Sequence, residues 1–501
     1  MNSSLIHSVA SVALLALPLC AQDVLAVKGG KVITMTGAVI DDATVLIENG
    51  RILKLGKSAD IEVPWTAKVI DATGKTVLPT YVLAHTTGGV RGMNEQMQNV
   101  PWISIADALD PANTFFEDCL RNGVGTVHAI PGNQTLLGGS GMVVRPFGRT
   151  VEDMAVATSS GLKISLFAQG GGRLQQIRKL HRSLDDVREY LVDFERRKAE
   201  FEKEKKAGAI ASDKEWTEEY DRQKKPVIDL LQKKIKGWLF VPSAAEVPEA
   251  IRLTKELNLV LVLGPNMHKA IDELKALNVP VVLDETIEYF EVDPETQVEQ
   301  KIATPSLFAA AGIPFALSIG IGGASGYPWW QLATCVRNGV DRQTALKALT
   351  TVPAQLLSLD DQLGSLAEGK LGNLQILTGD PLLATTWVET VVLEGMVVYE
   401  RAKDQRLKYL FAEPKPQGDA TTLKEPKDKA EPKDKAEPKD KAEPKDKAEP
   451  KDKAEPKDKA EPKDKAEPKD KAEPKDKAEP KDKAEKAPQG GKTGAPAKEG
   501  K

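Results

Sequence analysis

Alternating apolar and polar positions predict short strands near both ends of the folded part of the chain. The N-terminal set contains KVITM, TVLIEN and RILKLG, and Asn49-Gly50 between the last two is typical of a tight β-hairpin. A related pattern returns in NLQILTG and TVVLEGMVVYE. We therefore expect residues 22–78 and 366–412 to form the two parts of one composite β-sandwich domain.

The middle region, residues 79–365, alternates apolar strands with amphipathic helices. Strand segments include VGTVHAI, GWLFVPS and LVLVLG, and helical segments include VPEAIRLTKELN. This order is typical of a parallel sheet with crossover helices. Seven or eight such units favour an α/β fold of the (β/α)8 TIM-like barrel class, and a doubly wound sheet is the alternative. Residues 178–236 are highly charged and predict a solvated helical insertion.

The first 21 residues are typical of a secretory signal peptide. Residues 9–21 form an apolar run that is too short for a membrane span and ends in small residues. A buried N-terminal helix and a lipid anchor on Cys20 are the alternatives. We expect an exported protein, periplasmic or extracellular, without a transmembrane segment.

Residues 413–501 have low complexity. The unit EPKDKA repeats ten times between Glu425 and Ala484. A proline in every repeat prevents a continuous helix, and the repeats offer no apolar residue larger than alanine for a core. This tail is expected to be disordered, either as a plain spacer or as an arm that contacts the cell envelope.

Charge and cysteine content narrow the classes of function. The chain has 69 Lys and Arg against 73 Asp and Glu, and each repeat is neutral, so the remaining body is mildly acidic. A nucleic-acid partner is therefore not expected. Once a signal peptide is removed, Cys119 and Cys335 remain as two buried free thiols or as one disulfide. Two cysteines do not make a metal motif.

Several ordered segments resemble the amidohydrolase superfamily, and within it the imidazolonepropionase-like branch. They are VIDATGKTVLPTYVLAH, GVGTVHAIPGNQTLLGGSGMVVRPFGRTVEDMAV, LFAAAGIPFALSIG, DRQTALKALTTVPAQLL and LGSLAEGKLGNLQILTGDPL, within residues 25–400. The resemblance implies a barrel flanked by a sheet domain, and a divalent metal at the barrel mouth that hydrolyses cyclic amides or other non-peptide C–N bonds. It also implies a homo-oligomer, since barrels of this family often pair.

Most metal-ligand positions implied by that resemblance are substituted. His85 matches the first member of the family's His-x-His pair, but Thr87 stands at the second. Pro242 and Gly320 stand where the family carries His and Asp. A catalytic zinc needs three protein ligands beside an open position. No cofactor is therefore predicted, and zinc is expected only if other residues have rebuilt the site.

Other residues are candidates for such a rebuilt site. His85 and His128 are candidate metal ligands, and interior hydrogen-bonded histidines are the alternative. Asp284 and Glu285 follow the strand VPVVL and, with His85, are candidates for acid and base catalysis. Capping of a following helix by Asp284 is the alternative. His268 is a candidate displaced ligand.

A glycine-rich loop, GIGGASGYPWW, follows the last predicted strand. Loops at this place in barrels often bind phosphate through backbone N–H groups. Gly322, Gly323 and Ser325 are therefore candidate ligand-binding residues, and a flexible turn is the alternative.

The sequence supports two main functions. One is a hydrolase of non-peptide C–N bonds with an altered or absent metal. The other is a pseudoenzyme that binds a small molecule or a partner through the barrel mouth. A third, structural role would make the tail the functional part and the barrel its rigid head. The number of His, Asp and Glu side chains that converge at the mouth separates the first two.

Overall fold

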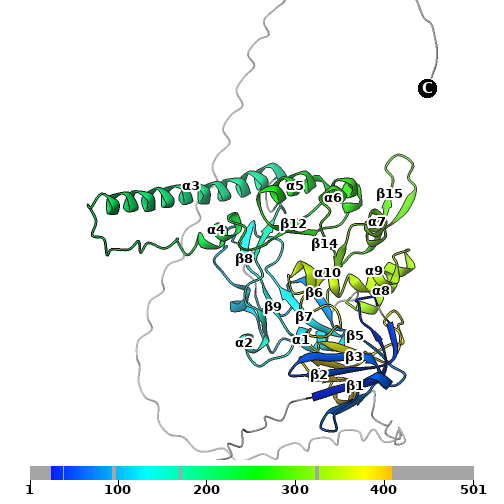
Figure 1. The fold of residues 1–501 in the computed structure, drawn as a ribbon. Helices are drawn as coiled ribbons and strands as arrows, with labels where there is room; N and C mark the ends of the chain where they lie inside the picture. Colours follow the sequence, from blue (N-terminus) through cyan, green and yellow to red (C-terminus); the bar gives the residue numbers. More distant parts are fainter. Residues whose placement is uncertain (1–23, 38, 93–96, 169–171, 322–325, 409–501) are drawn as a thin grey trace, which may run out of the picture. The chain divides into compact units, whose positions relative to one another are not determined.

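The computed structural model describes residues 24–408, with gaps at 38, 93–96, 169–171 and 322–325. The expected signal peptide and the expected repeat tail lie outside the described residues. Figure 1 shows the described body, which combines several sheets with flanking helices. A mixed α/β architecture is therefore confirmed.

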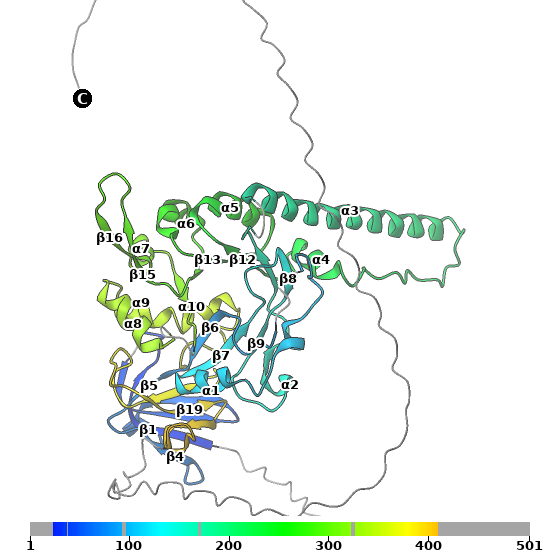
Figure 2. The same ribbon diagram turned by 180° about the vertical axis from the view of Figure 1, so that it is seen from behind.

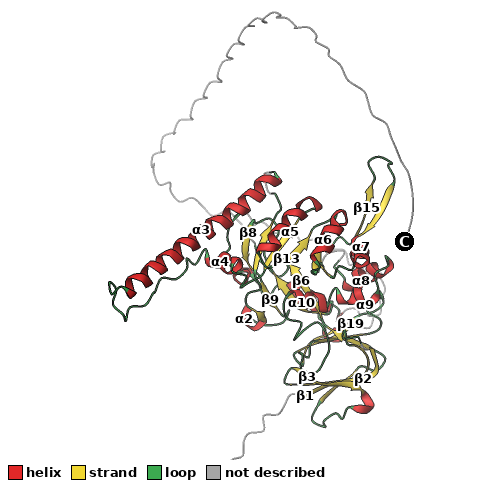
Figure 3. Ribbon diagram, turned by 45° about the horizontal axis from the view of Figure 1, so that its top comes forward, coloured by secondary structure: helices red, strands yellow, loops and turns green. Residues whose placement is uncertain are grey.

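Eight strands from both ends of this body form one hydrogen-bonded sheet (Figure 3). Their order is β20-β19-β18-β5-β1-β2-β3, and β4 pairs with β1. The hairpin predicted at Asn49-Gly50 joins β2 to β3, and Glu394-Gly395 joins β19 to β20; all four residues have positive φ. The strands are β1 Val24–Ile33, β2 Val39–Glu48, β3 Arg51–Lys57, β4 Lys68–Asp71, β5 Thr76–Pro79, β18 Leu374–Leu377, β19 Val388–Leu393 and β20 Met396–Glu400.

The middle region forms two further sheets, β10-β9-β7-β6 and β17-β14-β13-β12-β11-β8. Pairing is parallel between β6 and β7 and along β11, β12, β13, β14 and β17, whereas β8 and β9 run antiparallel to their neighbours. The strands are β6 Tyr81–Thr86, β7 Val124–Ala129, β8 Leu137–Ser140, β9 Met142–Val144, β10 Ala155–Ala157, β11 Leu162–Ser165, β12 Gly237–Val241, β13 Leu259–Leu263, β14 Val281–Leu283 and β17 Phe315–Leu317.

These strands do not join into one closed hydrogen-bonded ring among the described residues. The amide of Val82 in β6 donates to Leu349 O at 2.8 Å, and that of Leu317 in β17 donates to Ala348 O at 3.0 Å. Residues 348–349, just before α10, therefore accept the backbone hydrogen bonds through which β6 and β17 would otherwise pair with each other. Parallel strands with crossover helices are present as expected, while a closed barrel is not shown.

Helices lie against the middle sheets, and one extends well away from them (Figures 1 and 2). That helix, α3, has 34 residues and begins the charged insertion. A two-stranded hairpin, β15 Glu288–Val292 with β16 Glu299–Ala303, was not predicted. The helices are α1 Thr114–Arg121, α2 Val151–Met154, α3 Arg173–Lys206, α4 Lys225–Leu231, α5 Val247–Glu256, α6 Ile271–Leu277, α7 Thr304–Ala311, α8 Pro328–Arg337, α9 Arg342–Lys347 and α10 Thr351–Leu356, and the 3-10 turns are η1 Ser58–Asp60, η2 Ile105–Ala108, η3 Ala244–Glu246, η4 Met267–Ala270 and η5 Arg401–Lys403.

The predicted free thiols are confirmed. Cys119 in α1 and Cys335 in α8 are buried and unpaired with each other, so the disulfide alternative is wrong. Burial raises the pKa of the Cys335 thiol to about 12. Within the part of the chain that the structure describes, no helix is both long and apolar enough to cross a membrane.

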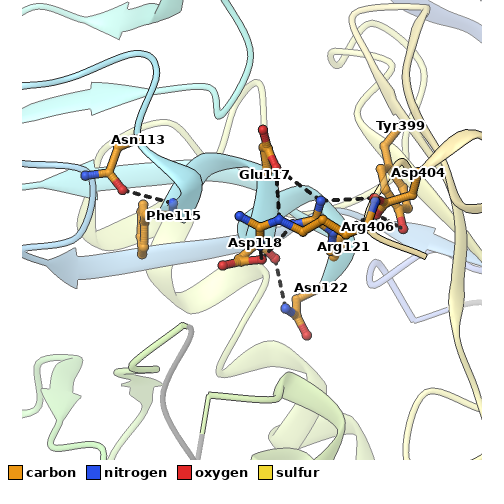
Figure 4. Close-up of polar contacts among 9 residues, drawn as sticks. All are labelled: Asn113, Phe115, Glu117, Asp118, Arg121, Asn122, Tyr399, Asp404 and Arg406. Atoms are coloured by element: carbon orange, nitrogen blue, oxygen red, sulfur yellow. Dashed lines mark hydrogen bonds and ion pairs between the residues drawn. The ribbon is translucent and has the colours of Figure 1, made fainter. Parts of the chain in front are cut away.

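A polar network fastens the segment after β20 to helix α1 (Figure 4). Arg121 donates from Nε and Nη2 to the two carboxylate oxygens of Asp404, at 2.6 and 3.1 Å. It also donates to Asp118 at 2.7 Å, and Arg406 donates to the same carboxylate at 3.0 Å. Tyr399 donates its hydroxyl to Asp404 at 3.2 Å. The composite sheet and the middle region are thereby tied together near the end of the described chain.

Candidate functional site

A pocket of about 260 Å³ lies where several strands of the middle region end. The carboxyl ends of parallel strands meet at one edge, which is where barrel and doubly wound folds place their ligands. We call this the mouth pocket, and residues at the ends of β6, β12, β13, β14 and β17 contribute to it. It is lined by His85, Thr86, Thr87, Asn133, Phe240, Val262, Leu263, Asp284, Glu285, Ser318, Ile319 and Gly320.

His85, near the end of β6, is hydrogen-bonded to Lys163, which is not one of the predicted site residues. Its Nε2 lies 2.7 Å from Nζ of Lys163, which comes from β11 and is fully buried. The ammonium also lies 5.6 Å from the ring centroid of Phe240. An ammonium has only donors, so Lys163 donates and His85 Nε2 accepts.

This environment keeps His85 neutral. Burial lowers the pKa of His85 well below its ordinary value, and the positive charge of Lys163 lowers it further. Because Nε2 accepts, the proton of the neutral ring is on Nδ1. His85 therefore lines the mouth pocket as an uncharged imidazole, and its Nε2 lone pair already accepts the hydrogen bond from Lys163.

His128 does not join the mouth pocket. Its Nδ1 donates to Ala84 O at 2.6 Å, and its Nε2 accepts from the Ser160 hydroxyl at 2.6 Å. The ring lies against Trp238 with centroids 4.2 Å apart, and burial lowers the pKa of His128 to about 3. A cluster of His85, His128 and Asp284 is therefore not formed, because both ring nitrogens of His128 are bound elsewhere.

Asp284 and Glu285 do line the mouth pocket, as expected. Asp284 Oδ1 accepts from the backbone of Thr286 at 2.9 Å, in a turn that leads into strand β15 rather than a helix. The helix-capping alternative for Asp284 is therefore wrong. The carboxylate of Glu285 lies directly against Gly320, in the space where a side chain at position 320 would begin.

His268 is not among the residues that line the mouth pocket. His268 accepts a hydrogen bond from, or donates one to, Tyr289 at 3.0 Å and pairs with Glu291 at 3.2 Å, so it is not a displaced ligand in the mouth pocket. Gly322, Gly323 and Ser325 lie outside the described residues.

The described residues of the mouth pocket do not fit a family-type metal centre. Over the described ranges, no group of three or more His, Cys, Asp and Glu side chains could hold a metal ion. In the mouth pocket, Lys163 already occupies His85 Nε2 and places a positive charge behind it. A catalytic zinc needs three protein ligands, and the charge of Lys163 opposes a second cation at that nitrogen.

Comparison with solved structures identifies the fold. An amidohydrolase from Thermotoga maritima superposes with a TM-score of 0.63 and 27% sequence identity, over 75% of this chain and 100% of that one. The fold is that of an amidohydrolase. A molinate hydrolase has a TM-score of 0.45 at 19% identity, over 79% of this chain and 99% of that one. A β-aspartyl dipeptidase from Fervidobacterium islandicum has a TM-score of 0.45 at 14% identity, over 75% and 97%. No family model and no curated protein matches the sequence.

Two relationships in this amidohydrolase fold escaped sequence reasoning. Lys163 lies within the apolar run LKISL, and a lysine inside an otherwise apolar strand was the available signal for a buried charge with a specific partner. The approach of Glu285 to Gly320 joins the ends of two neighbouring strands, β14 and β17, and had no signal in either segment alone.

Proposed function

We propose that this protein has an amidohydrolase fold adapted to bind a small molecule at the mouth pocket without a family-type metal centre. The observation that carries the proposal is the hydrogen bond between Lys163 Nζ and His85 Nε2. His85 is the single position at which the chain retains a histidine of the family's first pair. Its nitrogen serves to satisfy a buried ammonium, which is a structural use of that residue.

The pocket itself supports binding. It combines apolar side chains from β12, β13 and the β17 end with carboxylates and hydroxyls, which is the usual composition of a ligand site. Its volume of about 260 Å³ suits a small ligand. This proposal retains the amidohydrolase lineage and assigns the mouth a binding role.

A second candidate is metal-independent hydrolysis of non-peptide C–N bonds. It is favoured by one observation, that Glu285 and His85 line the same pocket. A carboxylate there would serve as general base toward a water molecule. In that case, the protein would have inherited its class of substrate from the imidazolonepropionase-like branch.

Export, a tail that contacts the cell envelope and a homo-oligomeric state remain proposals from the sequence. Each concerns residues or surfaces beyond the mouth pocket, and none is needed for the binding role.

The test measures metal content of the full chain by plasma mass spectrometry after incubation with Zn²⁺, Mn²⁺ and Fe²⁺ and desalting. We expect no stoichiometric ion, with the same result for H85A. Close to one ion per chain that is lost in H85A would overturn the proposal. In parallel, cyclic amides are incubated with the metal-free protein. Hydrolysis that disappears in E285Q would replace the binding proposal with the second candidate.

A further inference from the structure

Two carboxylates, those of Asp284 and Glu285, are part of the lining of the mouth pocket. Both carboxylates lie at the end of strand β14, next to each other in the sequence.

Negatively charged groups outnumber positively charged ones around the pocket. Two carboxylates line the pocket, and the ammonium of Lys163 lies outside this lining and donates to the ring of His85. The low pKa of His85 leaves that ring uncharged at neutral pH. Glu285 is exposed and makes no ion pair with another described residue, so its charge is available to a ligand.

The same pocket is also lined by apolar side chains. Phe240, Val262, Leu263 and Ile319 come from the ends of two strands, β12 and β13, and from the loop after β17. Phe240 offers a ring beside which a flat body can pack, and it already lies 5.6 Å from the Lys163 ammonium on its inner side. A ligand that fills the pocket would therefore have an apolar or aromatic body and a polar end.

We propose that the mouth pocket binds a small organic cation that carries several N–H donors on an apolar body, as an aryl amidinium does. Glu285 pairs with the charge, and Asp284 accepts a further N–H group. This inference rests on the proposed binding function and names its ligand class.

Isothermal titration calorimetry on the full chain tests the inference with benzamidine, its neutral analogue benzamide and the anion benzoate. We expect benzamidine to bind at least about tenfold more tightly than benzamide, a difference of about 1.4 kcal/mol, and benzoate to give no heat. In E285Q and in D284N the preference for benzamidine should fall toward that for benzamide. The matched control is E273Q, which changes an exposed glutamate on α6 and should bind as the unchanged protein does.

Equal binding of benzamidine and benzamide, or benzamidine binding that is unchanged in E285Q and D284N, would overturn the cation inference. So would the absence of benzamidine binding in a folded, metal-free protein, and in that case the binding proposal would stand with another ligand class. Stoichiometric metal that depends on His85 would instead overturn the proposed function itself. The two failures are therefore distinguishable.

Discussion

Nζ of Lys163 lies 2.7 Å from Nε2 of His85, and this contact joins strand β11 to strand β6 inside the amidohydrolase fold. A fully buried lysine is rare unless a partner stabilises it. Here one partner is the neutral imidazole of His85 at the edge of the mouth pocket. The contact gives His85 a structural role that does not depend on a bound metal.

Replacing Lys163 by methionine should raise the pKa of His85. The change removes the positive charge that disfavours the imidazolium, while burial, the larger cause, keeps the pKa below its ordinary value of about 6.5. Nuclear magnetic resonance titration of the ¹⁵N-labelled imidazole measures the shift. K255M, on the surface of α5, is the control. A His85 pKa that stays the same or falls in K163M would show that Lys163 does not act through its charge.

Adding a methyl group at Gly320 should disturb ligand binding more than folding. An alanine there would displace the Glu285 carboxylate, which is the end of a flexible exposed side chain, so the unfolding free energy should change by less than about 0.5 kcal/mol. Benzamidine binding should weaken in G320A but show no further loss when G320A is added to E285Q. Calorimetry of the two single variants and the double variant checks this coupling. Additive losses would mean that Gly320 acts independently of Glu285.

Removing the Ser160 hydroxyl should destabilise the fold. S160A leaves the buried Nε2 of His128 without its donor, and an unsatisfied buried acceptor costs about 1–3 kcal/mol. S159A removes the same group from an exposed neighbouring position and should have no comparable effect. Urea denaturation followed by circular dichroism compares the two. Equal stability of both variants would contradict the role of Ser160 as the partner of His128.

Asp404 should contribute stability that depends on pH. Burial alone would raise the pKa of Asp404, but the hydrogen bonds from Arg121 and from the Arg406 backbone lower it below its ordinary value. Since the folded pKa is below the unfolded one, the carboxylate stabilises the fold above the unfolded pKa of about 3.9, and the contribution is lost as the pH falls through the folded pKa. D404N should cost about 1.5–3 kcal/mol at pH 7, the scale of hydrogen bonds to a charged group.

Denaturation at several pH values tests the Asp404 prediction, with D361N as the exposed control. The curves of D404N and the unchanged protein should converge in acid. A difference that stays constant from neutral pH to acid would show that the lost stability comes from packing and not from ionisation of Asp404.

Local sequence patterns predicted much of the fold because they reflect the backbone conformation and the burial of neighbouring residues. Asn49-Gly50 accommodates positive φ at both positions, so the β2–β3 hairpin was readable from two residues and the alternation around them. Apolar runs such as LVLVLG became the buried parallel strand β13. The pairing of β6 and β17 with residues 348–349, by contrast, was not readable, because hydrogen bonds between distant segments leave no local pattern.

The sequence by itself determined many of the strands and helices and the amidohydrolase resemblance, because both follow from the identity and order of the residues. It also placed Asp284 and Glu285 at a strand end, where the carboxyl edge of a parallel sheet collects side chains. Only the tertiary structure decided that His85 accepts a hydrogen bond from Lys163. It also decided that the ring of His128 is hydrogen-bonded to Ala84 and Ser160. The position of the Glu285 carboxylate against Gly320 is likewise a result of the tertiary structure. Each of these depends on the spatial approach of residues far apart in the chain, and such an approach is set by the packing of whole strands.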